Sequence, residues 1–361
     1  MARFDAAELR AGAASILDGL GTPPAVAEEV AASLVRADLR GHESHGVVRL
    51  ATAYGSMVDA GAIDPAATAT VASRDGATVT VDGRRAFGQH TGRVAVDAGA
   101  TAAAAHGVAV VGVRNGTHLG RIGEWAERAA DRGLAFVAFV NSGVSTPTVT
   151  VPGSADRTLS TNPIAVGLPT FDARPFPVVL DMATSQVAHG KVTRRHVDGT
   201  TMPEEWTTTA DGEGVTDATA FEEGAGSLLP LGGLTAGYKG FGLATVAELL
   251  AGVVGGSAVF GTEDPGHVNN GAVFVFVDPL AFATRDRIER LIDAFDAHVG
   301  TAEMYDAVPR PPTAGADRPL LPGEPEHRTA TERRTDGIPM SDRTMAALAD
   351  VADDLGVDVD G

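Results

Sequence analysis

The order in which hydrophobic periods follow one another along the chain constrains its fold most. Apolar residues at helical spacing cover residues 5 to 20 and 23 to 38. The period then changes to short apolar runs, which are typical of buried strands. Such runs lie at residues 108 to 113, 134 to 140, 177 to 180 and 272 to 277. Helical spacing returns over residues 340 to 355, so we predict an α/β fold in which both chain ends form one helical unit.

Turn and breaker residues divide this pattern further. Asp75-Gly76 lies within residues 68 to 81, whose alternating valines predict a hairpin. Residues 198 to 227 show no sustained period, so we expect a surface excursion there. Prolines recur over residues 308 to 339, where we expect no regular element and a segment that wraps over the molecule. Further helices are predicted over residues 91 to 105, 121 to 132, 238 to 254 and 285 to 298.

Composition excludes several classes of partner and chemistry. The chain of 361 residues has a net charge of −19, which repels nucleic acid and anionic membranes. It has no cysteine, which removes thiol nucleophiles, thiolate metal sites and disulfides. The start of the chain carries charges where a signal peptide needs an apolar core. The apolar stretch 241 to 260 contains Glu248, so it fits a buried helix better than a membrane span, and we expect a cytoplasmic protein.

The basic residues are almost all arginine, because lysine occurs only at Lys191 and Lys239. A surface rich in Asp and Glu and poor in Lys suits concentrated salt, where screening weakens self-repulsion. We therefore expect a halophilic protein, in which the two lysines are informative positions because a compact ammonium is kept only there.

Common site motifs are missing. No G-x-G-x-x-G follows a strand, and there is neither a P-loop nor a G-x-S-x-G elbow, so a Rossmann domain is not supported. His42 and His45 are three residues apart, whereas a zinc helix H-E-x-x-H needs its histidines four apart. We therefore predict no metal site.

An acid-base group and a carboxylate receptor occur together in Ser44-His45-Gly46-Val47-Val48-Arg49. With Ser44 as the N-cap of a helix, Val47, Leu50 and Tyr54 would form part of an apolar stripe. His45 and Arg49 would then be neighbours on the other face, with Gly46 letting a ligand approach the backbone. Imidazole exchanges protons near neutral pH, and guanidinium binds a carboxylate through two hydrogen bonds. The plainer alternative is a helix start with a solvated His and Arg.

Further candidate residues follow predicted strands or open helices, where ligands bind in α/β folds. His118 follows the first buried run, Ser142 the second and Asp181 the third. A carboxylate such as Asp181 near an imidazole would fix its tautomer, although a helix-capping Asp is the plainer explanation. Capping and turn roles stay equally open for the other groups, which are Thr161-Asn162, Gly237-Tyr238-Lys239-Gly240 and Leu321-Pro322-Gly323-Glu324.

Taken together, these segments resemble the malate/L-lactate dehydrogenase family, which is unrelated to the Rossmann-type enzymes of those names. The order and approximate spacing agree from about residue 5 to residue 340. The segments that carry the resemblance are Leu39 to Gly46 with Arg49, Thr117-His118-Leu119-Gly120, Thr161-Asn162-Pro163, Asp181 to Ser185, Gly190-Lys191, Leu229-Pro230, Gly237-Tyr238-Lys239-Gly240 and Pro322-Gly323-Glu324.

The resemblance implies an oxidoreductase that binds NAD or NADP in a non-Rossmann α/β domain with a mixed sheet. It places that domain at residues 77 to 283, and a helical substrate and dimerisation domain at residues 1 to 76 with 284 to 361. It also implies a homodimer with active sites near the subunit interface.

The resemblance assigns roles residue by residue. His45 is similar to the family's proton donor, Arg49 to its contact with the substrate carboxylate, and His118 to a catalytic base near the nicotinamide. Ser44 or Asp181 would orient the imidazole. Arg121 departs from the small residues of many members, which leaves the substrate open. The cofactor-contacting positions are His118, Ser142, Thr161, Asn162, Asp181, Met182, Ala183, Lys239, Pro322, Gly323 and Glu324.

The expected reaction is hydride transfer between nicotinamide and the carbonyl carbon of a small 2-oxo acid, with protonated His45 supplying the proton. A reductase of cyclic imino acids would share nearly every residue above. Two alternatives of other classes are a metal-dependent hydrolase and a non-catalytic nucleotide-binding or scaffold protein. No acid or arginine reports on the ribose 2′ position, so NAD and NADP both remain.

Overall fold

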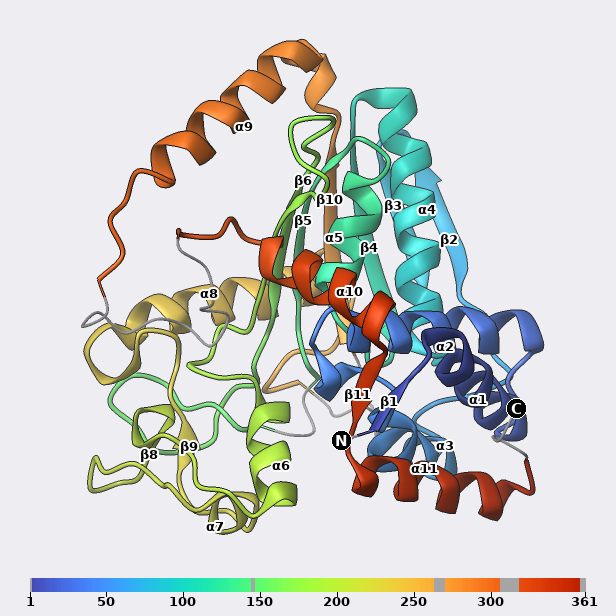
Figure 1. The fold of residues 1–361 in the computed structure, drawn as a ribbon, viewed down its shortest axis with the longest axis vertical. Coiled ribbons are helices and arrows are strands. Elements are labelled where there is room, and N and C mark those ends of the chain that lie inside the picture. The colour runs from blue at the N-terminus through green and yellow to red at the C-terminus, as the bar shows by residue number, and fades with distance from the viewer. Residues whose placement is uncertain (1, 144–146, 263–269, 306–317, 358–361) are drawn as a thin grey trace.

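The computed structural model describes residues 2–143, 147–262, 270–305 and 318–357. A seven-stranded sheet with the order β2-β3-β4-β10-β5-β6-β7 forms its centre (Figure 1). The pair β3·β4 is parallel and the other neighbours are antiparallel, so the predicted mixed sheet is confirmed. The strands are β2 (Thr70–Asp75), β3 (Thr78–Asp82), β4 (Val108–Gly116), β5 (Ala135–Val140), β6 (Ile164–Leu168), β7 (Val178–Met182) and β10 (Asn270–Val277).

Helices cover both faces of this sheet. Phe274, Phe276 and Trp125 belong to one buried cluster, in which α4 (Gly88–His106) and α5 (Gly123–Ala130) cover one face. The opposite face meets α8 (Gly233–Val253), whose end lies so close that a Cβ at Gly112 would be 2.4 Å from the Val254 carbonyl oxygen. The predicted helices and strands of this unit therefore exist, and β6 is a strand that the sequence pattern did not reveal.

Both ends of the chain form the helical unit, as predicted. Strand β1 (Ala2–Phe4) pairs antiparallel with β11 (Ile338–Met340) and holds the two ends together. The buried residues Leu17, Leu34 and Leu348 share one core. The helices are α1 (Ala6–Gly19), α2 (Pro24–Leu39), α3 (Gly55–Asp59), α10 (Glu324–Asp336) and α11 (Asp342–Leu355).

Two expectations about irregular segments were wrong. Within residues 308 to 339, α10 and β11 are regular, because Pro325 occupies a first-turn position that helices tolerate; residues 308–317 lie outside the described part. Residues 198 to 227 help to build a small lobe around the fully buried Phe221. Its elements are α6 (His189–Asp198), the 3-10 turn Glu204–Trp206, β8 (Thr207–Thr208), α7 (Ala218–Glu222) and β9 (Ser227–Leu228).

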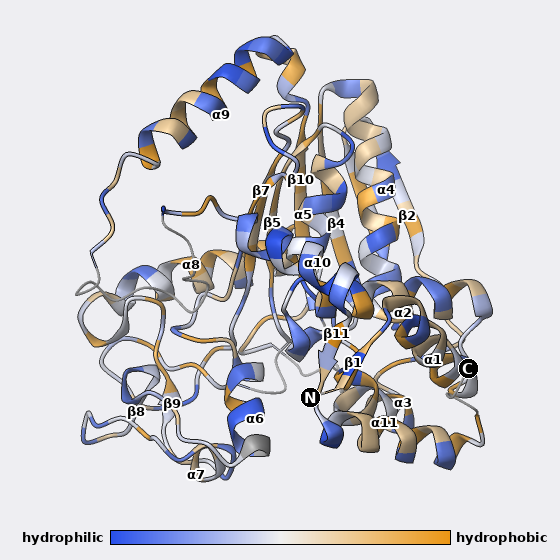
Figure 2. Cartoon of the chain, viewed as in Figure 1, coloured by the Kyte–Doolittle hydropathy of each residue, from blue (hydrophilic) through white to orange (hydrophobic). Residues whose placement is uncertain are grey.

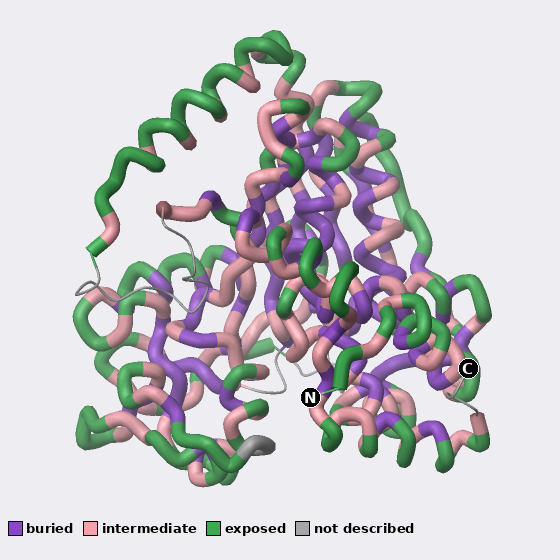
Figure 3. Tube along the Cα trace, viewed as in Figure 1, coloured by how far each residue is buried: buried purple, intermediate pink, exposed green. Residues whose placement is uncertain are grey.

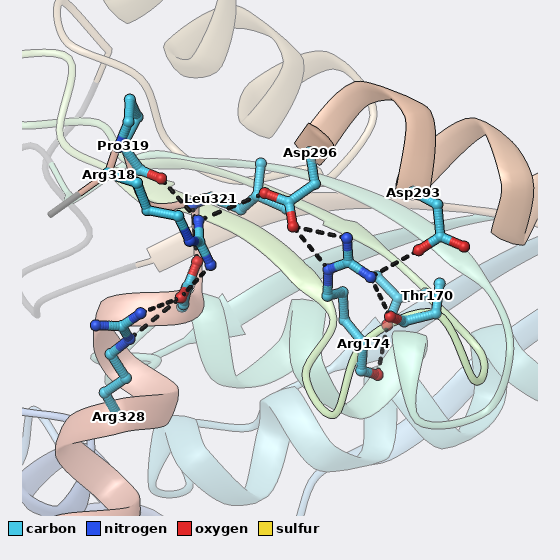
Figure 4. A network of polar contacts seen from close by, with 10 residues as sticks. Thr170, Arg174, Asp293, Asp296, Arg318, Pro319, Leu321 and Arg328 are labelled. Carbon is cyan, nitrogen blue, oxygen red and sulfur yellow. Dashed lines mark hydrogen bonds and ion pairs between the residues drawn. The ribbon is translucent and has the colours of Figure 1, made fainter. Parts of the chain in front are cut away.

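Helix α9 (Arg285–Val299), which follows the 3-10 turn Pro279–Ala281, projects as an arm beside the body of the molecule (Figure 1). None of its residues is buried, and Figure 3 draws most of it as exposed. Its acidic side chains anchor it: Arg174 donates to Asp293 at 2.7 Å and to Asp296 at 2.6 Å (Figure 4). Among the described residues, no helix is both long and apolar enough to cross a membrane.

Candidate active site

A deep cleft of about 1450 Å³ lies where the helical unit, the small lobe and the sheet meet. Its volume exceeds the roughly 300 to 1,000 Å³ of an ordinary small-molecule site, so it has room for a dinucleotide beside an organic acid. Most residues singled out from the sequence line it, namely Ser44, His45, Arg49, His118, Ser142, Thr161, Asp181, Met182 and Ala183.

The turn that carries His45 is shaped by a buried carboxylate. Residues Glu43–His45 form a 3-10 turn, and Asp38 Oδ2 accepts a hydrogen bond from the Val47 N–H at 2.9 Å. A Cβ at Gly46 would lie 1.8 Å from Asp38 Oδ1. The predictions that Ser44 caps a helix and that Gly46 admits a ligand were therefore wrong, because packing against Asp38 requires the glycine and bends the chain.

The apolar stripe after this turn was predicted correctly, since Val47, Leu50 and Tyr54 are each 1% exposed. The chain there forms a π-helical turn over Leu50–Tyr54 before α3 begins. Such turns are rare and frequent at functional sites. His45 and Arg49 thus share the cleft without sharing one regular helix.

The contacts of Ser44 link His45 and Arg49. Arg49 Nε donates to the Ser44 carbonyl oxygen at 2.7 Å, and the Ser44 hydroxyl lies 3.0 Å from His45 Nδ1. Ser44 therefore orients the imidazole and leaves His45 Nε2 for a ligand. Burial, followed by the positive charge of Arg49, lowers the pKa of His45 well below its usual range. The ring is consequently neutral at physiological pH in the free protein.

His118 stacks on His45, with the ring centroids 5.5 Å apart. The Tyr54 hydroxyl lies 2.8 Å from His118 Nδ1 and accepts from Gln89 Nε2 at 2.5 Å. The Tyr54 hydroxyl keeps one proton to donate, and when that proton goes to Nδ1 the ring proton of His118 lies on Nε2. Burial, with Arg49 second, lowers the pKa of His118 to about 3.

Sequence reasoning missed the site roles of Tyr54 and Gln89. Tyr54 occupies a core position of the apolar stripe, where its hydroxyl needs a partner. That requirement was the one available signal, and it did not identify His118 or Gln89 as the partner.

Of the two residues expected to orient the His45 imidazole, Ser44 contacts it, and no hydrogen bond joins Asp181 to it among the described residues. Asp181 Oδ2 accepts from the Gly123 N–H at 2.8 Å, at the start of α5. Beside it, the buried Arg121 forms an ion pair with Glu127 at 2.6 Å. Burial alone would lower the pKa of Arg121, but Glu127 and Asp181 together raise it. The Nε of Arg121 is buried without a hydrogen-bond partner among the described residues, so a cationic group faces this end of the cleft.

Ser142 follows the end of β5, and Thr161 and Asn162 precede the start of the neighbouring strand β6. The hydroxyls of Ser142 and Thr161 are 3.3 Å apart on the cleft wall. Asn162 lies behind them and is fully buried. Its Oδ1 accepts a hydrogen bond from the Ser142 N–H at 3.2 Å, and its Nδ2 donates to Glu248 at 2.8 Å. Ser142 and Thr161 can thus contact a cofactor, and Asn162 supports them from beneath.

Besides Asn162, four predicted cofactor positions do not line the cleft. Glu324 is buried and accepts a hydrogen bond from Arg328 at 2.6 Å. The Pro322 carbonyl oxygen accepts from the Val179 N–H at 3.0 Å, so this turn continues the edge of β7. A Cβ at Gly323 would meet the Pro177 carbonyl oxygen at 2.8 Å. Lys239 is exposed on α8, outside the lining.

The cleft lies between a mixed sheet and a helical unit. It holds a pair of neutral imidazoles, a guanidinium and a recess lined by hydroxyl groups. This arrangement defines an enzyme that performs acid-base chemistry on small acids. Residues 4–349 match the profile of the malate/L-lactate dehydrogenase family, so this chain belongs to that family. It is an oxidoreductase, a hydroxy-acid dehydrogenase that uses a nicotinamide cofactor. Membership removes the hydrolase and scaffold alternatives.

Characterised relatives cover nearly the whole chain. Hydroxycarboxylate dehydrogenase B of Escherichia coli O157:H7 is 33% identical over 98% of this chain and 95% of its own. L-sulfolactate dehydrogenase of Methanocaldococcus jannaschii is 29% identical over 96% and 95% of the two chains. The structure of Δ1-piperideine-2-carboxylate reductase from Pseudomonas syringae superposes with a TM-score of 0.80 at 27% identity, over 98% and 100%.

Proposed function

We propose that this enzyme interconverts a small 2-hydroxy acid and its 2-oxo acid, with NAD or NADP as cofactor. The convergence of His45, Arg49 and His118 in one cleft with Ser142 and Asp181 carries the proposal. When bound, the nicotinamide supplies the hydride chemistry at the second carbon of the substrate.

Arg49 would hold the substrate carboxylate. Its Nε is engaged by the Ser44 carbonyl oxygen, which fixes the plane of the guanidinium and leaves the two terminal nitrogens to bind the carboxylate. The charge of that carboxylate would offset the positive charge that lowers the pKa of His45.

His45 would move the proton. In the direction of oxidation, neutral His45 donates its Nδ1–H to Ser44 and accepts the substrate hydroxyl proton at Nε2 as the hydride leaves the carbon. In reduction, the same Nε2 returns the proton to the developing alkoxide. The lowered pKa of His45 favours oxidation of the hydroxy acid in the free enzyme, because the ring starts neutral. The sequence had led us to expect a protonated ring.

His118 would keep a neutral ring beside the reacting carbon. Its Nδ1 accepts from Tyr54, so its Nε2–H is available as a hydrogen-bond donor. Because its pKa is about 3, it would act as a donor to oxygen and not as the titrating base.

The absorbance of reduced nicotinamide tests this proposal. NADH and NADPH are each offered with a panel of 2-oxo acids, at high and low salt. His45→Ala should remove most turnover while cofactor binding persists, and Arg49→Lys should mainly raise KM because the two-nitrogen geometry is lost. Loss of cofactor binding in His45→Ala would contradict the assignment.

Reduction of a cyclic imino acid is the second candidate, favoured by the similarity to the reductase from Pseudomonas syringae. Both substrates present a carboxylate beside an unsaturated carbon, which Arg49 and His45 would treat alike. Including a cyclic imino acid in the same panel separates the two, because the preferred substrate shows the higher kcat/KM.

We also propose a cytoplasmic homodimer, with residues 1 to 76 and 284 to 361 as its substrate and dimerisation domain. Apolar side chains are exposed on α9 within that domain and on α8, β6 and β7 outside it, and Figure 2 shows apolar and polar residues alternating along α9. A second copy would bury these faces. The exposed side chains include Leu168, Leu180, Val246, Leu249, Val253, Leu291 and Phe295.

Sedimentation tests the dimer. Phe295→Asp should shift the protein toward monomer, whereas Arg290→Asp, an exposed substitution on the same helix, should not. A monomeric wild-type protein at assay concentrations would refute the dimer.

A further inference from the structure

Glu248 is a buried carboxylate that the mechanism above does not use. It lies on the apolar helix α8, and its side chain is almost wholly buried. Three N–H groups donate to it: the Asn162 side-chain amide at 2.8 Å, the Phe260 backbone at 3.0 Å and the Asn141 side-chain amide at 3.5 Å. An ionised carboxylate only accepts hydrogen bonds, so it suits all three donors.

One branch of these contacts leads from Glu248 to the cleft wall formed by Ser142 and Thr161. Asn162 Nδ2 donates both to Glu248 and to the Ala244 carbonyl oxygen, the latter at 3.1 Å. This fixes the amide so that its Oδ1 accepts from the Ser142 N–H at 3.2 Å. With its N–H engaged there, Ser142 presents its hydroxyl to Thr161 and to the cleft.

A second branch leads from Glu248 to the loop that carries His118. Asn270 Nδ2 donates to the Asn141 carbonyl oxygen at 2.8 Å, and Asn270 Oδ1 accepts from the Leu119 N–H at 3.1 Å. Leu119 follows His118 directly in the chain. The two asparagines, both buried, therefore hold the His118 loop against the end of β5.

We infer that Glu248 is a positioning residue for the proposed reaction. It sets the direction of the hydrogen bonds in both branches, and so holds His118 and the wall of Ser142 and Thr161 in one arrangement. A glutamine there would turn an NH2 group toward an amide NH2. Rotating the Asn162 amide would not relieve this conflict, because its NH2 group would then face the Ser142 N–H. This inference rests on the proposed function.

Amide hydrogen exchange in Glu248→Gln, followed by nuclear magnetic resonance, tests the inference without turnover. The Ser142 and Leu119 N–H groups should exchange roughly ten-fold faster than in the wild type, because their side-chain acceptors would no longer be held in place. The Val137 N–H, within β5, should keep its rate. Equal increases at all three amides would indicate general destabilisation and would overturn the inference.

Fluorescence titration with reduced cofactor gives a second readout. The dissociation constant of NADH or NADPH, whichever binds the wild type, should rise roughly ten-fold in Glu248→Gln. Glu8→Gln makes the same change of charge on the exposed face of α1 and should leave the constant unchanged. An unchanged constant in Glu248→Gln would overturn the inference. Weakened cofactor binding in a protein that reduces no 2-oxo acid would support it and contradict the proposed function.

A double variant separates positioning from loss of charge. In Glu248→Gln combined with Asn162→Asp, the carboxylate moves to position 162, where it can accept from the new glutamine amide and from the Ser142 N–H. This variant should recover the slow exchange of Ser142 and bind the cofactor within about five-fold of the wild type. Asn162→Asp alone should bind most weakly, because it sets two carboxylates against each other. A double variant weaker than either single variant would overturn the inference.

Discussion

Replacing His118 by Asn offers the sharpest test of the electrostatics in the cleft. The pKa of His118 is about 3 in the folded protein, against about 6.5 for an unperturbed histidine. Below pH 6.5 the His118 side chain binds a proton in the unfolded chain but stays neutral in the folded protein. This residue therefore lowers the free energy of unfolding as the pH falls.

The size of the effect follows from the two pKa values. At pH 8 the contribution is close to zero, and at pH 5 it reaches at most about 2 kcal/mol. Urea unfolding of the wild type and of His118→Asn at constant salt measures it. Loss of the hydrogen bond to Tyr54 lowers the free energy of unfolding of the variant by the same amount at every pH. The informative quantity is therefore how the difference in unfolding free energy between wild type and variant changes from pH 8 to pH 5.

The wild type should lose about 2 kcal/mol more than His118→Asn over this range. Nuclear magnetic resonance gives a second readout, since the His118 ring signal should not titrate between pH 8 and pH 5 in the folded protein. A difference in unfolding free energy that stays constant with pH, or a ring that titrates near pH 6.5, would refute the reasoning.

Three other predictions concern packing, buried charge and salt. Gly46→Ala should abolish most activity and lower the unfolding temperature, because its Cβ would lie 1.8 Å from Asp38 Oδ1, whereas Gly55→Ala, whose nearest neighbour is 3.9 Å away, should be tolerated in both assays. Glu127→Gln should lower the free energy of unfolding by about 3 kcal/mol in urea, because the buried Arg121 would lose its ion pair and keep only the charge of Asp181 nearby. A change below about 1 kcal/mol would contradict this. The unfolding temperature should rise steeply with potassium chloride, given the net charge of −19, and full stability in salt-free buffer would disprove the halophilic adaptation.

Local periodicity in the sequence was sufficient for most of the architecture. The runs at residues 108 to 113 and 272 to 277 became adjacent central strands, and the chain ends met in one helical unit. These features could be predicted because a strand buried on both faces is a short continuous apolar run, whereas a helix buried on one face has an apolar period of about 3.6. The family, too, was evident from the order of short segments that carry His45, His118 and Asp181.

The tertiary structure decided the details that matter for chemistry. Ser44 fits the preferences of a helix cap, yet the buried Asp38 bends the chain at Gly46 and turns Ser44 toward the imidazole. Tyr54 fits a core position, yet its hydroxyl sets the tautomer of His118. Such roles depend on partners distant in the chain, 64 residues away for Tyr54 and His118. Periodicity reports only which face of an element is buried, and a hydrogen bond or pKa depends on the particular atoms that another element brings against that face.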